Sequence, residues 1–206
     1  MSNQVLLNRD YTLILDKSGS MSSVDSRSPG RSRWVEAQES ALALARKCET
    51  LDPDGITVYT FSSRFKRYDN VTSRKVEQIF RENDPVGSTD LAGVLRSATQ
   101  DFFQRKAKGQ AKINGETILV VTDGEPNDKR AVVDVIIQAT QQMQRDEDLA
   151  ISFIQVGDDP SATAYLKLLD DELEGAGAAF DIVDTVTLDD MADMSLAEVL
   201  LNAIYD

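Results

Sequence analysis

The chain contains no histidine and a single cysteine in 206 residues. Without histidine it cannot form the Ser-His-Asp or Cys-His nucleophile arrangements, or the imidazole sites typical of zinc. The lone Cys48 has no partner for an intramolecular disulfide, and its place in a helical pattern indicates a buried or half-buried thiol. Any metal ion bound by this chain must therefore be bound by oxygen atoms.

Long hydrophobic segments are also missing. The longest apolar runs, TILVV and AISFIQV, have the length of a strand and are too short to cross a bilayer. The first residues, MSNQVLLNRD, lack the basic region and apolar core of a signal peptide. We therefore expect a cytoplasmic protein, and the cysteine and histidine usage favours a prokaryotic source.

Basic residues are scarce in the second half of the chain. Residues 101–206 carry 8 Lys and Arg against 22 Asp and Glu, and the whole chain has a net charge of −13. Such a surface repels nucleic acid and anionic membranes, so we expect neither as a partner. The simplest interpretation is that these acids keep the surface solvated, and a dedicated basic partner is the alternative.

Apolar periodicity alternates between strand-like and helix-like segments. We expect strands at 11–16, 56–62, 116–122, 150–156 and 180–183, with 66–71 as a candidate antiparallel neighbour of the second, and helices at 34–48, 73–82, 90–107, 128–146, 161–174 and 189–204. The strands are apolar nearly throughout, which is typical of a parallel sheet covered by helices on both faces. No repeat or linker divides the chain, so we predict one α/β domain over residues 1–206, with its core from about residue 9.

Two of the strands end in an aspartate. Asp16 closes the first strand, and Asp123 follows the long apolar strand ETILVVT. Doubly wound sheets bind ligands beyond the carboxyl ends of their strands, at the point where the strand order reverses. If these two strands flank that point, the two carboxylates face one crevice. The stretch DKSGS adds Ser18 and Ser20, and VGSTDL adds Thr89, so that five oxygen-bearing side chains converge from three loops.

This constellation resembles the metal-ion-dependent adhesion site of the von Willebrand factor A domain. The pattern Asp-x-Ser-x-Ser, a distant Thr and a distant Asp is matched by DKSGS, GSTDL and TDGEP, in the family's order. The resemblance runs from about residue 9 to the C-terminus and is closest to the prokaryotic intracellular members. It implies a Rossmann-like, doubly wound and mostly parallel sheet of about six strands, with helices on both faces and one antiparallel edge strand.

The chemistry of these residue types agrees with the resemblance. Mg²⁺ prefers six oxygen ligands in near-octahedral geometry and keeps several waters. The hydroxyls of Ser18, Ser20 and Thr89 would be neutral ligands, while Asp16 and Asp123 would bind the ion directly or through water. Mg²⁺ fits this set best, Mn²⁺ fits it too, and Ca²⁺ prefers more ligands.

An ion held mainly by neutral hydroxyls stays electron-poor and favours an anionic ligand at its open position. In the family that ligand is a Glu or Asp side chain of a partner protein. The resemblance thus implies a metal-dependent protein-binding module and not an enzyme. Single-domain intracellular members often work with ATPases, kinases or phosphatases. The sequence does not determine the partner or the oligomeric state.

Each candidate ligand also has an ordinary structural interpretation. Ser18 and Ser20 are typical turn or helix-cap residues, and Thr89 could cap a helix that begins near Asp90. Asp90 itself is best explained as an acid in the first turn of that helix. A scaffold that has the fold but never binds metal is a further alternative.

The competing hypothesis is an enzyme. Phosphatases of the haloacid dehalogenase type place a nucleophilic aspartate at the end of the first strand, and DKSGSM and TDGEPND superficially resemble their motifs. Asp16 would then be phosphorylated, with Asp123 and Asp128 holding Mg²⁺. Ser18 stands where those enzymes have their general acid, which leaves the leaving group without a proton donor.

Overall fold

The computed structural model describes residues 3–25, 28–124 and 126–205. Its strands are β1 (Asp10–Asp16), β2 (Ile56–Phe61), β3 (Phe65–Val71), β4 (Glu116–Thr122), β5 (Leu149–Gln155) and β6 (Val183–Thr187). Its α-helices are α1 (Arg33–Leu51), α2 (Ser73–Glu82), α3 (Leu91–Ala107), α4 (Lys129–Thr140), α5 (Pro160–Asp171), α6 (Leu188–Ala192) and α7 (Leu196–Tyr205). Short 3-10 helices are η1 (Asn3–Leu6), η2 (Gly19–Ser22) and η3 (Asp146–Asp148).

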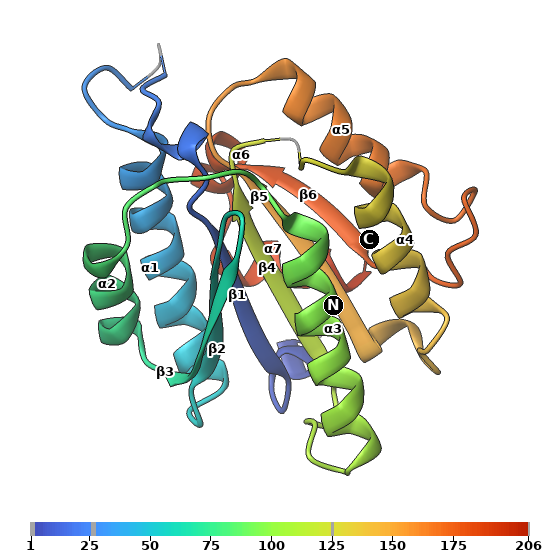
Figure 1. Ribbon diagram of the computed structural model, residues 1–206. Coiled ribbons are helices and arrows are strands. Elements are labelled where there is room, and N and C mark those ends of the chain that lie inside the picture. Colours follow the sequence, from blue (N-terminus) through green and yellow to red (C-terminus); the bar gives the residue numbers. More distant parts are fainter. Residues whose placement is uncertain (1–2, 26–27, 125, 206) are drawn as a thin grey trace.

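The six strands form one sheet in the order β3-β2-β1-β4-β5-β6 (Figure 1). Every neighbouring pair is parallel except β2 and β3, so the antiparallel strand is at an edge. This is the predicted mixed, Rossmann-like sheet. The edge strand β3 carries exposed charged side chains, which discourage pairing with another chain.

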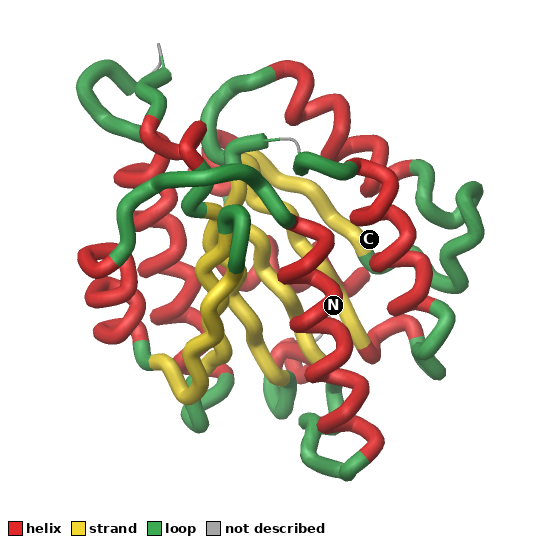
Figure 2. The backbone as a smooth tube through the Cα atoms, in the orientation of Figure 1, coloured by secondary structure: helices red, strands yellow, loops and turns green. Residues whose placement is uncertain are grey.

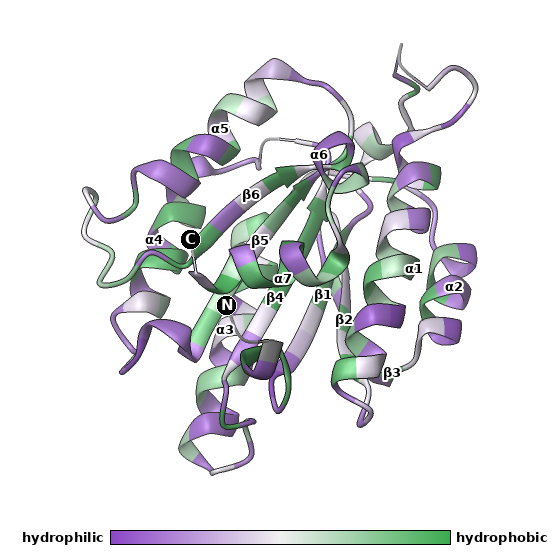
Figure 3. Ribbon diagram, turned by 180° about the vertical axis from the view of Figure 1, so that it is seen from behind, coloured by the Kyte–Doolittle hydropathy of each residue, from purple (hydrophilic) through white to green (hydrophobic). Residues whose placement is uncertain are grey.

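Alternate residues of the central strands supply two separate cores. Leu13 and Leu119 pack on one face with α1, α2 and α7, whereas Ile14 and Ile118 pack on the other with α3, α4 and α5. Figure 3 shows the first of these faces, with α7 lying across the hydrophobic strands. Cys48 is buried in the same core, as predicted. In the described residues no helix is both long and apolar enough to span a membrane.

The last predicted helix is in fact two helices. Residues 189–204 were expected to be continuous, but α6 ends at Ala192 and α7 begins at Leu196. Ser195 starts α7 by a reciprocal cap: its hydroxyl accepts from the Glu198 amide at 3.2 Å, and Glu198 accepts from the Ser195 amide at 2.8 Å. Two hydrogen bonds at this break favour a new helix start over continuation.

Two further boundaries differ from the sequence prediction. The helix expected at 128–146 ends at Thr140, whose hydroxyl donates to the Ile137 carbonyl and accepts from the Ala179 amide. The final strand, expected at 180–183, is Val183–Thr187, where it pairs with β5 from Ile151 to Gln155. Both errors have one cause, since contacts with distant residues decide where these elements stop and start.

Candidate metal centre

The candidate site lies where the strand order of the sheet reverses. The chain leaves β1 toward β2 on one side, whereas β4 pairs with β1 on the other side. Asp16 is the last residue of β1, and Asp123 directly follows β4. The loops at this end of the sheet, green in Figure 2, include the long connection from α2 to α3 that crosses the strand ends. The predicted placement of both aspartates is therefore correct.

Four of the five predicted residues belong to one hydrogen-bonded network. Asp16 accepts from the Ser18 amide through Oδ1 at 2.7 Å and from the Thr122 hydroxyl through Oδ2 at 2.6 Å. The Ser18 and Ser20 hydroxyl oxygens lie 3.1 Å apart. The Ser20 hydroxyl donates to Asp123 Oδ1 at 3.0 Å. The two carboxylates are thus linked through the backbone amide and hydroxyl of Ser18 and the hydroxyl of Ser20.

The fifth residue, Thr89, reaches the same edge through backbone contacts. The Gly19 amide donates to the Gly87 carbonyl at 2.9 Å, which ties the serine loop to the Thr89 segment. The Thr89 amide donates to Asn127 Oδ1 at 3.1 Å, and its carbonyl accepts from the Asn127 amide at 3.0 Å. In the described part of the chain, no hydrogen bond joins the Thr89 hydroxyl to the other four residues. The structure therefore places Thr89 at the site without including its side chain in the network.

Capping does not account for these hydroxyls. The N-cap of α3 is Asp90, which accepts from the Gly93 amide at 3.0 Å, so Thr89 does not cap the helix. Ser18 stands at the N-cap position of η2, but its side chain makes no capping bond. Asp90 is thus the N-cap of α3 and not the first-turn acid expected from the sequence, and the cap interpretation of Ser18 and Thr89 is also wrong.

The site combines two buried carboxylates and the buried Ser18 with the more exposed Ser20 and Thr89. Asp16 and Asp123 are 0% and 2% exposed, whereas Ser20 is exposed and Thr89 is partly exposed. Burial raises the pKa of Asp16 to about 6; the hydrogen bonds from Thr122 and Ser18 oppose this rise, and the charge of Asp123 adds to it. A cation between the loops would offset this unfavourable burial of negative charge.

These residues fit a hard divalent cation. Within the described ranges, no three Asp, Glu, His or Cys side chains are grouped so as to hold a metal ion. An ion bound at this edge would therefore depend on hydroxyl ligands, and the network supplies two of them beside two carboxylates. The donor set matches Mg²⁺ or Mn²⁺ better than a softer metal.

Sequence reasoning missed four residues that shape the site. The Thr122 hydroxyl donates to Asp16, and Asn127 accepts from the Thr89 amide. Arg33 donates to Asp123 Oδ2 through Nη1 at 2.9 Å. Arg33 also makes a two-nitrogen contact with Asp25. A usable signal existed only for Thr122, which lies inside the TDG motif. The other contacts join loops that the sequence does not relate.

The comparison with known families adds a decisive observation. Residues 11–126, more than half of the chain, match the family model of the von Willebrand factor type A domain. The chain belongs to this family. Von Willebrand factor A domains generally mediate metal-dependent protein interactions and are typically not enzymes. No curated protein sequence matches the chain significantly.

Solved structures with a similar fold include a D319A mutant of the PilB minor pilin from Streptococcus sanguinis, with a TM-score of 0.65 and 14% identity. The match covers 95% of this chain and 60% of the pilin chain. The manganese-loaded TRAP protein of Plasmodium vivax matches with a TM-score of 0.54 and 15% identity, over 91% of this chain and 72% of that one. At such identities the likeness shows the fold alone.

Proposed function

We propose that this von Willebrand factor A domain is a metal-dependent protein-binding module. A divalent cation, Mg²⁺ in the first instance, is held by Ser18, Ser20, Thr89, Asp16 and Asp123. It supplies an open coordination position for the carboxylate of an Asp or Glu on a partner protein. The proposal includes the cytoplasmic location expected from the sequence, and a partner within an ATPase, kinase or phosphatase system.

The observation that supports the proposal most strongly is the hydrogen-bonded path Asp16–Ser18–Ser20–Asp123 at the reversal of the strand order. Hydroxyls that donate to one another and to a carboxylate can rotate to present their lone pairs to a cation. Thr122 would hold Asp16 in place during this change, because its hydroxyl donates to Oδ2 of that carboxylate. Rotation of the Ser18 and Ser20 hydroxyls would therefore turn these two groups from hydrogen-bond donors into ligands.

The phosphotransferase alternative receives less support from the geometry. Both oxygens of Asp16 accept hydrogen bonds, which leaves the carboxylate poorly placed to attack a phosphoryl group. Asp128, the expected second metal ligand of such an enzyme, is the N-cap of α4 and accepts from the Ala131 amide at 2.9 Å. Phosphoryl transfer would require Asp16 and Asp128 to give up hydrogen bonds that they accept in this structure.

Calorimetric titration of metal-stripped protein with Mg²⁺ and with Mn²⁺ tests the proposal. We expect one ion per chain in the wild type, and at least tenfold weaker binding in Thr89→Ala and Asp16→Asn, since each removes a ligand or its charge. Ser88→Ala is the matched control, because its hydroxyl contacts Ser63 at 3.0 Å and not the site. Manganese anomalous scattering from a soaked crystal would locate the ion.

Three results would overturn the metal site: no binding at millimolar metal, equal binding by Thr89→Ala and wild type, or a manganese peak away from the five residues. Capture of the partner is tested separately. Immobilised wild type and Thr89→Ala are compared with Mg²⁺ and with chelator. A protein retained only by the wild type with Mg²⁺ supports the module, and one retained equally in all four conditions does not.

A further inference from the structure

Arg33, the first residue of α1, places a positive charge against the candidate metal centre. Its Nη1 donates to Asp123 Oδ2 at 2.9 Å, while Nε and Nη2 donate to Asp25 at 3.0 and 2.8 Å. The side chains of Arg33, Asp25 and Asp123 are 14%, 10% and 2% exposed, so this ion pair is largely shielded from solvent. Shielding increases the attraction between the charges, although burying them has a desolvation cost, and it makes the loss of one partner costly.

The surrounding backbone is shaped to admit this triad. Gly157, just after β5, has a φ of +82°, and a Cβ there would lie 2.5 Å from Asp25 Oδ2 and 2.8 Å from Arg33 Nε. Only glycine tolerates both this backbone conformation and so close an approach. Hydrogen bonds with Asp25 are the main reason that the pKa of Arg33 is raised, so the guanidinium is permanently charged.

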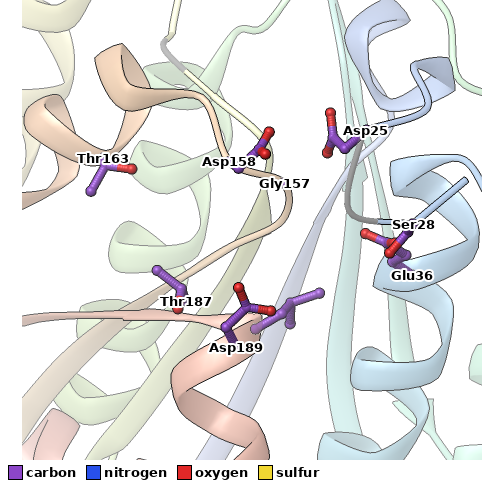
Figure 4. A pocket seen from close by; sticks show the side chains of 9 residues that line it. Asp25, Ser28, Glu36, Gly157, Asp158, Thr163, Thr187 and Asp189 are labelled. Atoms are coloured by element: carbon purple, nitrogen blue, oxygen red, sulfur yellow. The ribbon is translucent and has the colours of Figure 1, made fainter.

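A small acidic pocket of about 100 Å³ adjoins Asp25. Figure 4 shows Asp25 and Glu36 on one side of it, with Asp158 and Asp189 approaching from the ends of β5 and β6. Glu36 lies one turn beyond Arg33 on α1, and its buried Oε1 has no hydrogen-bond partner among the described residues. Asp25, which lines this acidic pocket, is therefore a second carboxylate partner of Arg33 that does not depend on Asp123.

One carboxylate oxygen of Asp123 accepts a hydrogen bond from the Ser20 hydroxyl, and the other accepts one from the Arg33 guanidinium. The Ser20 hydroxyl can turn from donating to Asp123 to accepting a cation, because a hydroxyl has lone pairs. A guanidinium has no acceptor and cannot do so. A divalent ion that uses Asp123, directly or through water, must share this carboxylate with a fixed positive charge and is repelled by it.

We propose that Arg33 is an internal cation that neutralises Asp123 in the metal-free protein and competes with the divalent ion for that carboxylate. Arg33 is a positioning residue that sets the metal affinity of the site; the inference rests on the proposed metal-binding function. Arg33 stabilises the metal-free protein and weakens metal binding, and Asp25 with its acidic pocket retains Arg33 when the ion takes Asp123.

The test compares metal-stripped wild type, Arg33→Gln, Arg33→Lys and Arg31→Gln by calorimetric titration with Mg²⁺ and Mn²⁺. We expect Arg33→Gln to bind either ion about tenfold more tightly than the wild type, because a nearby like charge is removed. Arg33→Lys should lie between the two, since one ammonium cannot satisfy Asp25 and Asp123 together. Arg31→Gln, which removes the same charge from an exposed pair with Glu39, should bind like the wild type.

Thermal unfolding supplies a readout that does not depend on the binding curves. Without metal, Arg33→Gln should melt below the wild type, and saturating Mg²⁺ should reduce the difference, because the ion replaces the lost positive charge. If Arg33→Gln fails to fold, Arg33→Lys is judged by the same criteria.

The outcomes separate this inference from the proposed function. Wild-type binding with equal or weaker binding by both Arg33 variants would overturn the role of Arg33 and leave the metal site intact. Absence of binding in all four proteins would overturn both. Tighter binding by the Arg33 variants, with Arg31→Gln unchanged, would support the competition.

Discussion

Asp148 shows how strongly one side chain in this molecule is held by its surroundings. It is 1% exposed, forms an ion pair with Lys106, and accepts from the amides of Gln144 and Arg145 at 3.0 and 3.1 Å. Burial alone would raise its pKa, but these partners outweigh burial and lower the pKa of Asp148 to about 2. The folded state therefore favours the ionised form of Asp148 over the protonated form.

The sign of the pH dependence follows from this shift. A carboxyl group whose pKa is lower in the folded state contributes stability above its unfolded pKa of about 4, and loses it as the pH falls toward 2. Asp148→Asn should therefore lower the free energy of unfolding by roughly 1–2 kcal/mol at pH 7, and by much less near pH 2. Urea titrations at pH 7, 4 and 2.5 measure this. The exposed neighbour variant Asp146→Asn should lose no stability at pH 7, and a pH-independent loss in Asp148→Asn would contradict the assignment.

At the scale of elements, Arg9 joins three segments at the end of the sheet opposite the candidate site. Its side chain is 0% exposed and donates to the Thr117 hydroxyl at 2.6 Å, to the Glu116 and Glu147 carbonyls at 2.8 Å each, and to the Asn114 carbonyl. These groups belong to β4, to the loop before it and to η3 before β5. Arg9 therefore links the starts of β1, β4 and β5.

Replacing this arginine should loosen that edge. Arg9→Met keeps much of the volume but leaves several buried carbonyls without a donor, so we expect a loss of about 3–5 kcal/mol in the free energy of unfolding. Chemical denaturation of wild type and variant provides the measurement. Arg64→Met, in the exposed turn between β2 and β3, is the control and should change stability by less than about 0.5 kcal/mol. A loss below about 1 kcal/mol for Arg9→Met would show that these hydrogen bonds are replaceable.

At the scale of the whole molecule, the two cores share the same central strands, so they should unfold together. Trp34 lies in the core of the α1 face, with its ring 4.4 Å from that of Phe80, and reports on that face alone. Far-ultraviolet circular dichroism reports on all helices. We expect the two signals to give the same urea midpoint, as a single cooperative domain requires. A separate Trp34 transition would show that the predicted single domain is wrong.

The acidic surface also belongs to this scale. With a net charge of −13, an acidic partner is repelled at long range, so the attraction that the proposed function needs must be local to the metal. Raising the salt concentration screens the repulsion and leaves short contacts with the ion less affected. This arrangement favours partners that offer one well-placed carboxylate over partners with extended acidic surfaces.

The sequence by itself determined the alternation of strands and helices, the antiparallel edge and the five candidate ligands, because these are written in local periodicity and in short motifs. Residues 16–20 combine a carboxylate with a turn in one short motif. Asp123 was found as a second strand-ending aspartate and Thr89 as part of a polar loop, and the resemblance then grouped all five residues in one site. The end of α4 was not predictable, because Thr140 contacts the distant Ala179 amide. The start of α7 was missed although the local Ser195–Glu198 spacing is a helix-start signal.

Only the tertiary structure decided how the candidate site is supported. The Arg33–Asp123 ion pair spans 90 positions of the chain, and the Thr89–Asn127 contact spans 38. Such pairs depend on the order of the strands and on which loops meet at one edge of the sheet. The spacing of residues along the chain does not predict such pairs, because a contact between distant loops leaves no periodic or local pattern in the sequence.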